Sequence, residues 1–230
     1  GEVLAMVGSK DYFNIKDEGN VNVVLAHRQP GSAIKPINYA LGIDRKLFTA
    51  ATLLADKPTC FKIPDQKDYC PENYDQQWHG PTQVRYALAN SFNIPAVKAL
   101  TINGLEDFVA SASAFGLNTL KDPTKYGPSL TLGGGEVTLL DLSTAYGVLA
   151  NAGKRVDLNP ILEVRDREGK VIEKSPSLPS NTRVISPGSA FIVSHILSDN
   201  GARAATFGER SYLNIKGHPE VAVKTGTTND

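Results

Sequence analysis

Helix signals follow one another through the middle of the chain, while strand signals are concentrated near its two ends. Glycine, proline and capping residues divide the middle into short stretches with helical spacing of apolar residues. The predicted helices run over Arg85 to Ser91, from Pro95 to just before Gly104, over Leu105 to Phe115, from the capping-box position Thr138 through Leu149 to a stop at Gly153, and from Ser186-Pro187 through Ile196. Predicted strands cover 2–7 and 220–224, and 161–165 forms a predicted hairpin with 170–173. This order predicts a mixed α and β fold dominated by helices in its middle.

Composition narrows the class of protein further. Hydrophobic residues make up 41% and charged residues 21% of the 230 residues, which excludes a disordered chain. Lys and Arg total 24 and Asp and Glu total 24, so the basic footprint of a nucleic-acid-binding protein is missing. No apolar run approaches the roughly 18 residues of a membrane span, and no signal peptide opens the sequence. The sequence therefore predicts a soluble globular domain.

Cys60 and Cys70 are the two cysteines of the chain, and they stand ten positions apart. Two cysteines cannot complete a structural zinc site, and the spacing differs from that of a redox Cys-x-x-Cys motif. A disulfide would contribute roughly 2–3 kcal/mol and would indicate an oxidising compartment. A pair of free thiols is the alternative. The four histidines are scattered without ligand spacing, so no metal site is predicted, and His195 is expected to be a core residue of its helix.

Ser32 and Lys35 form the first motif with chemical content. Two residues three positions apart share one face of a helix, and a neutral lysine there can deprotonate the serine hydroxyl. The positive end of the helix dipole would stabilise the developing alkoxide. Taken alone the pattern carries no weight, because a Ser-x-x-Lys occurs by chance on the order of once in a chain of this length.

The second motif must bring polar groups to this pair, and two segments could supply it. Ser198-Asp199-Asn200 has the literal Ser-Asp-Asn spelling, but Asn200-Gly201 after an apolar helix is typical of a helix stop. Ser91-Phe92-Asn93 lies between two predicted helices. We favour Ser91 and Asn93 over the literal match. For the nearby Tyr74 and Trp78 we favour ordinary packing over a place in a binding groove.

Lys224-Thr225-Gly226-Thr227 is the third motif and follows the apolar stretch predicted as a strand. Glycine removes the side chain that would keep a substrate from the backbone. Lys224 supplies a positive charge, and Thr225 and Thr227 supply hydroxyls for a carboxylate. Alone, these residues would also suit an ordinary polar turn.

In this order the three motifs resemble the signature of penicillin-binding proteins and β-lactamases. The flanking residues narrow the resemblance to the transpeptidase domain of class A, bifunctional penicillin-binding proteins. The matching flanks are Gly1–Gly8, Arg28–Ser32, Ala87–Val97, Leu132–Val137, Ala145-Tyr146 with Asn151–Gly153, and Lys224–Asp230. The resemblance therefore covers nearly the whole chain.

The resemblance implies acyl transfer on a peptidoglycan stem peptide that ends in D-alanyl-D-alanine. Ser32 would attack the penultimate carbonyl and expel the terminal D-alanine. Lys35 would be the base, with its pKa depressed by burial and by the charge of Lys224. Ser91 would relay a proton to the leaving amine, with Lys224 nearby, and Asn93 would hold Lys35 and the substrate amide.

The same resemblance assigns the remaining site residues and partners. Thr225, Gly226 and Thr227 would bind the terminal carboxylate. The backbone N–H groups of Ser32 and Thr227 would form the oxyanion hole, where each donor is typically worth about 2.7–4 kcal/mol. β-Lactams would acylate Ser32. No metal, cofactor or nucleic acid is implied, and the enzyme would work on the extracytoplasmic face of the bacterial membrane, held there only through an anchor upstream.

The implied fold is α+β, with a helical subdomain beside an antiparallel sheet that is cut after the Lys-Thr-Gly strand. We expect residues 1–230 to be a single transpeptidase domain, incomplete at both ends. The glycosyltransferase domain would lie upstream, and two further strands would follow Lys224–Thr227. Since outer strands alone bury too little apolar surface to be independently stable, the resemblance does not by itself assure activity of this chain in isolation.

Two other functions remain open at this point. The first is a hydrolase of the same superfamily, either a D,D-carboxypeptidase or a β-lactamase, which would need a deacylating water and its base. The second is a non-catalytic β-lactam-binding module. Persistence of the acyl-enzyme separates a β-lactamase from the other functions, and release of D-alanine separates an enzyme from a binding module.

Overall fold

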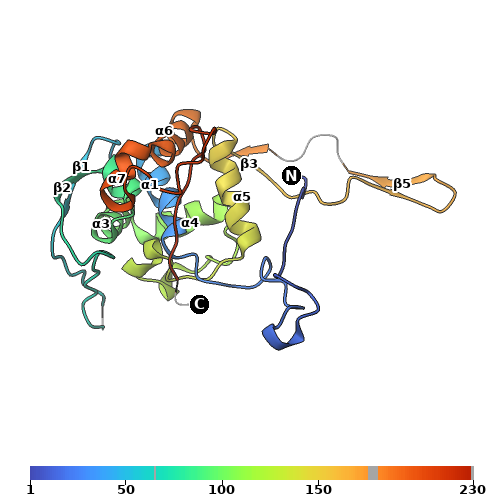
Figure 1. The fold of residues 1–230 in the computed structure, drawn as a ribbon, viewed down its shortest axis with the longest axis horizontal. Coiled ribbons are helices and arrows are strands. Elements are labelled where there is room, and N and C mark those ends of the chain that lie inside the picture. Colours follow the sequence, from blue (N-terminus) through green and yellow to red (C-terminus); the bar gives the residue numbers. More distant parts are fainter. Residues whose placement is uncertain (65, 176–180, 229–230) are drawn as a thin grey trace.

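Helix α1 (Lys35–Asp44) lies in the middle of a cluster of helices in the computed structural model, which describes residues 1–64, 66–175 and 181–228 (Figure 1). The surrounding helices are α2 (Val84–Ala89), α3 (Asn93–Asn103), α4 (Leu105–Phe115), α5 (Leu139–Ala150), α6 (Pro187–Ser198) and α7 (Asn200–Phe207). Short 3-10 turns are η1 (Ile15–Asp17), η2 (Gly31–Ile34), η3 (Pro123–Lys125) and η4 (Pro128–Leu132). Turn η2 leads directly into α1, so its residues are fixed by the most buried helix.

Burial of α1 follows from a sequence that is apolar on nearly every face, which is typical of a core helix. All of its residues from Lys35 to Ile43 are buried. Its buried Asn38 is satisfied: its side-chain amide donates to the Ala96 carbonyl at 3.0 Å and to Thr131 Oγ1 at 2.9 Å. Asn103 Nδ2 donates to Asn38 Oδ1 at 2.7 Å. These bonds fix α1 against α3 and η4 and so hold the start of α1 in place.

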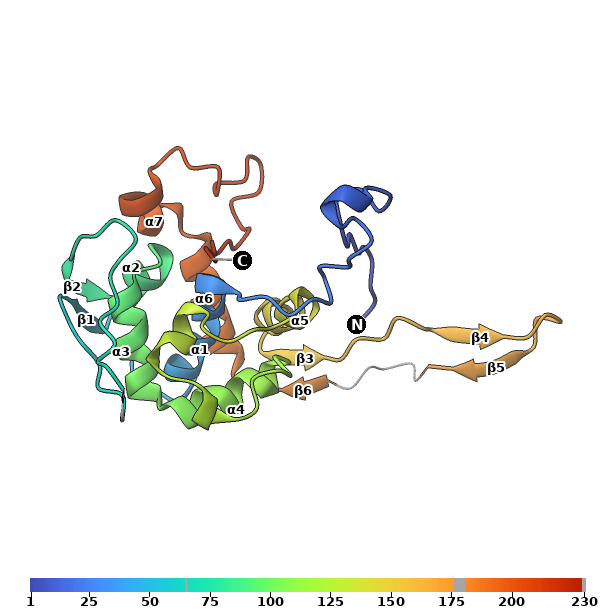
Figure 2. The ribbon, with the colours of Figure 1, turned by 90° about the horizontal axis from the view of Figure 1, so that it is seen from below.

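The described residues contain three separate two-stranded antiparallel sheets. They pair β1 (Leu53–Asp56) with β2 (Gly80–Gln83), β3 (Lys154–Val156) with β6 (Asn181–Arg183), and β4 (Glu163–Arg165) with β5 (Val171–Lys174). The β1–β2 pair lies beside α3, whereas the β4–β5 hairpin projects away from the helices (Figure 2). The α+β class and the predicted hairpin are confirmed, but the sheets are small and separate.

Local signals located the helices well. Helix α4 has the predicted bounds and ends at Gly116, whose φ of 107° only glycine adopts readily. Thr138 caps α5 by accepting from the Asp141 N–H at 3.0 Å, and Ser186 caps α6 by accepting from the Ser189 N–H at 3.2 Å. Helix α3 begins at Asn93, two residues before Pro95.

Helix α7 was not predicted, because Asn200-Gly201 was interpreted only as a stop. The structure ends α6 at Ser198 and begins α7 at Asn200. Asp199 lies between the two helices, and its side chain accepts from the Ala202 N–H at 2.9 Å. One aspartate cap therefore starts a new helix where the preceding one stops.

The strand predictions for 2–7 and 220–224 are wrong for the described structure. Neither segment is a strand, and Leu4 and Val7 are 89% and 74% exposed. Within the second segment, Val223 donates its N–H to the carbonyl of Leu197 in helix α6, at 3.0 Å, rather than to a strand. A strand needs a paired neighbour, and alternation of apolar residues does not supply one. The predicted strand before Lys224 is therefore an extended segment beside a helix.

His195 is also not the core residue that was expected. It lies on the exposed side of α6, and its Nδ1 lies 3.2 Å from both terminal nitrogens of Arg85. The apolar residues of α6 bury the opposite side, including Val193 and Ile196. No helix among the described residues is long and apolar enough to cross a membrane.

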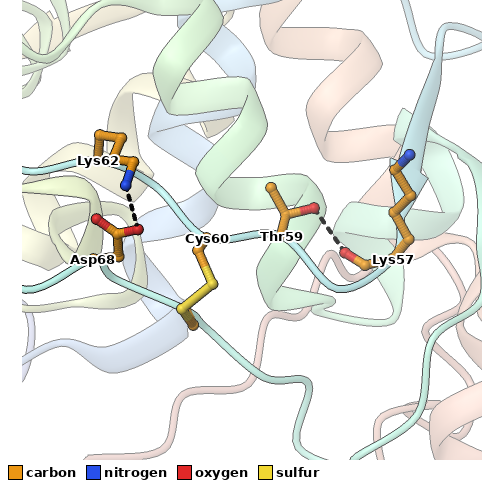
Figure 3. Close-up of a disulfide and its surroundings, with 6 residues drawn as sticks. Lys57, Thr59, Cys60, Lys62 and Asp68 are labelled. Carbon is orange, nitrogen blue, oxygen red and sulfur yellow. Dashed lines mark hydrogen bonds and ion pairs between the residues drawn. A yellow bond between two sulfur atoms is a disulfide. The ribbon is translucent and has the colours of Figure 1, made fainter.

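The loop between β1 and β2 is closed on itself by a disulfide between Cys60 and Cys70 (Figure 3). The backbones of Phe61 and Tyr69 exchange hydrogen bonds of 2.8 and 2.9 Å inside this ring. Lys62 Nζ also donates to Asp68 Oδ2 at 2.8 Å (Figure 3). The structure therefore contains the disulfide rather than two free thiols, and the cross-link restricts a long loop that reaches the site described next.

Candidate active site

The three sequence motifs meet in one cleft of about 460 Å³. Ser32 enters it from η2, Ser91 and Asn93 from the junction of α2 and α3, and Thr225–Thr227 from the extended segment that follows Lys224. Lys35 lies beneath the cleft with no exposed surface. Residues almost 200 positions apart in sequence are thus brought together around Ser32.

Lys35 is a buried amine surrounded by oxygen atoms. Its Nζ donates to the Ser91 carbonyl at 2.6 Å and to Asn93 Oδ1 at 2.7 Å, with the Ser91 hydroxyl and the Phe92 carbonyl at 3.3 Å. Burial, and next the charge of Lys224, lower the pKa of Lys35 well below its usual value. A neutral amine has two hydrogens for the two short bonds and keeps a lone pair. Lys35 can therefore accept a proton.

The Ser32 hydroxyl is half-buried at the start of α1. Within the described parts of the chain no hydrogen bond joins the Ser32 hydroxyl to Lys35 Nζ, which is bonded to Ser91 and Asn93 instead. Catalytic hydrogen bonds often tighten only when substrate binds. Ser32 therefore lines the cleft without a direct side-chain bond to Lys35.

Ser91 connects the two lysines of the site. Its hydroxyl lies 2.8 Å from Lys224 Nζ and 3.3 Å from Lys35 Nζ. Its φ of 61° is in the left-handed region, which non-glycine residues seldom adopt and which is frequent at functional sites. This conformation ends α2 and turns the hydroxyl toward both amines, where it can pass a proton between them and a bound ligand.

Lys224 is held by Ser91 and by the carbonyl of Thr225, to which its Nζ donates at 2.8 Å. Burial lowers the pKa of Lys224 to about 7. Near neutral pH this amine is thus divided between its charged and neutral forms. The charged form attracts a carboxylate and disfavours protonation of Lys35.

The depressed pKa of Lys224 predicts how stability depends on pH. Between about pH 7 and the unfolded lysine pKa near 10.4, the unfolded chain binds more protons than the folded one, so the free energy of unfolding rises with pH. Lys35 contributes with the same sign. Urea denaturation at pH 7 and pH 9 is expected to show this rise, and a smaller rise in Lys224→Met. An equal rise in both proteins would contradict the buried-amine assignment of Lys224.

Close backbone contact holds the third motif against the first. Gly31 has a φ of 54°, and a Cβ there would overlap the Thr227 carbonyl. A Cβ on Gly226 would come within 3.0 Å of the Pro30 carbonyl oxygen. On the other side of η2, Tyr146 of α5 donates its hydroxyl to the Ala33 carbonyl at 2.9 Å. These contacts place the backbones of Ser32 and Thr227, the predicted oxyanion-hole residues, side by side.

The literal Ser-Asp-Asn segment does not enter the site. Asp199 instead caps α7 and binds Arg85 at 3.1 Å. Sequence reasoning missed four further polar residues of the cleft wall, namely Asn73, Asp75, Asn90 and Thr206, of which only Asn90 lies in a segment that carries the family resemblance. It also misplaced Tyr74, which lines the cleft and is 89% exposed. Among the described residues no group of three His, Cys, Asp or Glu side chains could hold a metal ion.

Comparison with known proteins agrees with this arrangement. The profile of the penicillin-binding protein transpeptidase domain matches residues 1–230. The chain belongs to the penicillin-binding protein transpeptidase family. Penicillin-binding protein 1B of Vibrio cholerae is 32% identical over 236 residues, and penicillin-binding protein 1A of Aquifex aeolicus is 33% identical over 238 residues. Both alignments cover 100% of this chain, but 28% and 30% of these class A relatives.

Solved structures of the penicillin-binding proteins share the fold. The crystal structure of penicillin-binding protein 1A from Haemophilus influenzae has a TM-score of 0.69 at 26% identity, covering 80% of this chain and 31% of that one. Penicillin-binding protein 3 from Mycobacterium tuberculosis, complexed with ampicillin, has a TM-score of 0.66 at 20% identity and covers 80% of this chain and 44% of its own. The predicted transpeptidase fold is therefore confirmed.

Proposed function

We propose that the chain is a serine D,D-transpeptidase domain that cross-links peptidoglycan stem peptides through an acyl-enzyme on Ser32. The observation that carries the proposal is the buried Lys35 amine, bonded to Ser91 and Asn93 directly beneath the cleft that Ser32 lines. Membership of the transpeptidase family supports it. Burial lowers the pKa of this amine, which suits it to be the base that a serine nucleophile needs.

In the first half-reaction, Ser32 Oγ bonds to the carbonyl carbon of the penultimate D-alanine and its proton passes to Lys35. The C–N bond to the terminal D-alanine then breaks, and Ser91 donates a proton to the leaving amine. Lys35 and Lys224 lie within reach to return a proton to Ser91. The site can therefore move one proton from nucleophile to leaving group without water.

Substrate recognition is assigned to the third motif and the oxyanion hole. Lys224 and the hydroxyls of Thr225 and Thr227 bind the terminal carboxylate in this proposal, while Gly226 leaves room beside the backbone. The N–H groups of Ser32 and Thr227 stabilise the negative oxygen of the tetrahedral intermediate. In the second half-reaction an amine of a neighbouring peptide attacks the ester, forms the cross-linking amide and releases Ser32.

The same chemistry makes the domain a target of β-lactams, whose strained amide would acylate Ser32. An extracytoplasmic location is proposed with it, because the peptidoglycan substrate lies there and the Cys60–Cys70 disulfide suits an oxidising compartment. Peptide substrate, β-lactam and neighbouring peptide are thus the proposed partners of one domain formed by residues 1–230.

Product analysis tests the reaction class. A peptide ending in D-alanyl-D-alanine is incubated with the protein, with and without an added primary amine, and the products are resolved by mass spectrometry. The proposal expects D-alanine release and a peptide–amine product, both lost in Ser32→Ala. A product formed only with water would indicate a hydrolase. A stable penicillin adduct without any D-alanine release would indicate a binding module.

A further inference from the structure

A second polar cluster stands behind Ser91–Asn93, at the base of the disulfide-closed loop. Asp56, the last residue of β1, has no exposed surface. Its Oδ2 accepts from the His79 N–H at 3.0 Å, from His79 Nδ1 at 2.7 Å and from Asn73 Nδ2 at 2.8 Å. The loop begins after Asp56, and Asn73 and His79 in its returning half both bind the Oδ2 atom of Asp56. One carboxylate oxygen therefore ties the end of the loop to its beginning.

This cluster contacts the second motif directly. Asn73 Oδ1 accepts from the Asn93 N–H at 2.7 Å, and the carbonyl of Glu72 accepts from Asn93 Nδ2, also at 2.7 Å. The His79 ring stacks on Phe92 with centroids 3.9 Å apart and an interplanar angle of 11°. The loop therefore binds the backbone N–H and the side-chain amide of Asn93, and it also contacts the ring of the neighbouring Phe92.

The hydrogen bond of Asn93 Nδ2 fixes the orientation of the side-chain amide and so the direction of its oxygen. With the nitrogen bonded to Glu72, Oδ1 points to Lys35 Nζ at 2.7 Å. Phe92, the residue whose ring stacks on His79, also accepts a hydrogen bond from Lys35 Nζ through its backbone carbonyl. The orientation of the lysine amine therefore depends on residues that lie outside the three motifs.

Burial of the Asp56 carboxylate lowers the stability of the folded protein. A buried carboxylate loses its hydration, and Asp56 Oδ1 has no hydrogen-bond partner among the described residues. His79 Nε2 lies 3.1 Å from a second carboxylate, that of Asp75, which lines the cleft. Buried polar networks of this kind can fix a single arrangement, and here Asn73, which is bonded to Asp56, also holds Asn93.

We propose that Asp56, Asn73 and His79 are positioning residues that hold Ser91–Asn93 against Lys35. The inference rests on the proposed function, because it assigns these residues to the acylation step. The contacts of these residues with Ser91–Asn93 run through Asn93 and Phe92. Their loss slows the chemical step by misdirecting the Asn93 oxygen and the Lys35 amine, and this effect is separable from ligand affinity at His79, which does not line the cleft.

Asn73→Ala and His79→Phe test the proposal, since the second variant keeps a stacked ring and the backbone bond to Asp56 and removes the polar contacts of the imidazole. Both substitutions are introduced into the whole protein as the cell expresses it. Asn14→Ala is the matched control, because Asn14 Nδ2 also binds an aspartate, Asp17 at 2.7 Å, but on an exposed turn near the N-terminus. Stopped-flow labelling with a fluorescent penicillin gives the acylation rate at saturation and the dissociation constant separately. Hydrogen exchange of the Asn93 amide is measured by NMR in each protein.

The proposal expects a 10- to 100-fold slower acylation rate in both variants, corresponding to about 1.4–2.7 kcal/mol. It also expects a dissociation constant within threefold in His79→Phe, whose side chain does not line the cleft, faster exchange of the Asn93 amide in Asn73→Ala, and unchanged values in Asn14→Ala. Saturating rates within twofold in both variants, or an effect confined to the dissociation constant, would overturn it. Labelling that survives Ser32→Ala would instead overturn the proposed function. If the unaltered protein does not label, unchanged exchange of Asn93 in Asn73→Ala overturns the positioning role and faster exchange supports it.

Discussion

Ser32→Ala is expected to abolish covalent labelling by penicillin and to lower the acylation rate by about 10⁴-fold or more. Removing a serine nucleophile costs on the order of 10⁶ in rate where it has been measured. Here Ser32 lines the cleft, three residues before the buried Lys35. Intact-protein mass spectrometry would show one added penicillin on the unaltered protein, because ring opening adds the antibiotic without loss of atoms.

A matched control comes from the literal Ser-Asp-Asn segment. Ser198→Ala removes a serine at the end of α6, where its hydroxyl donates only to the His195 carbonyl at 3.2 Å. This variant is expected to acquire the adduct as the unaltered protein does. An adduct on Ser32→Ala, or its loss in Ser198→Ala, would place the nucleophile elsewhere.

Lys35→Met is expected to slow acylation by about 10²- to 10⁴-fold, the usual contribution of a general base. The variant keeps a long side chain in the buried space and removes the proton acceptor. Lys16→Met, at an exposed lysine of η1, is the control and is expected to leave the rate unchanged. Acylation rates from stopped-flow labelling between pH 5 and pH 9 provide the comparison.

The dependence of the acylation rate on pH also tests the role of Lys35 as the base. In the unaltered protein the rate falls as acid protonates Lys35, because a charged amine cannot accept the Ser32 proton. At higher pH, loss of charge on Lys224, with its pKa of about 7, weakens carboxylate binding. Lys35→Met is expected to lose the acidic limb. An acidic limb that persists in this variant would assign the base to another group.

Much of the helical architecture was predictable because its determinants are local. Thr138 and Ser186 cap their helices within three residues, and Gly116 ends α4 through its own backbone. The strands expected over 2–7 and 220–224 failed for the opposite reason. Pairing depends on a neighbour that is distant in sequence, and alternation of side chains does not specify that neighbour.

The candidate site likewise contains residues that the sequence could predict and residues that it could not. Ser32, Lys35 and Lys224 have hydroxyl or amine side chains that suit the proposed chemistry, so chemical reasoning and family resemblance could find them. Asn73 and His79 have no such signal, because they reach the site only through the folding of the disulfide-closed loop onto Asp56. Phe92 shows the same limit, since nothing in the sequence predicts that it stacks on His79.

The central claim is that Lys35 is an uncharged amine at neutral pH, and titrating that amine by NMR tests it most directly. Protein labelled with ¹⁵N at the lysine Nζ is followed from pH 5 to pH 11, and Lys35→Met identifies the Lys35 signal. The account predicts a neutral Lys35 amine at pH 7.5, while exposed lysines remain protonated. A Lys35 signal that stays protonated until the pH approaches the ordinary lysine pKa, about 10.4, would contradict it.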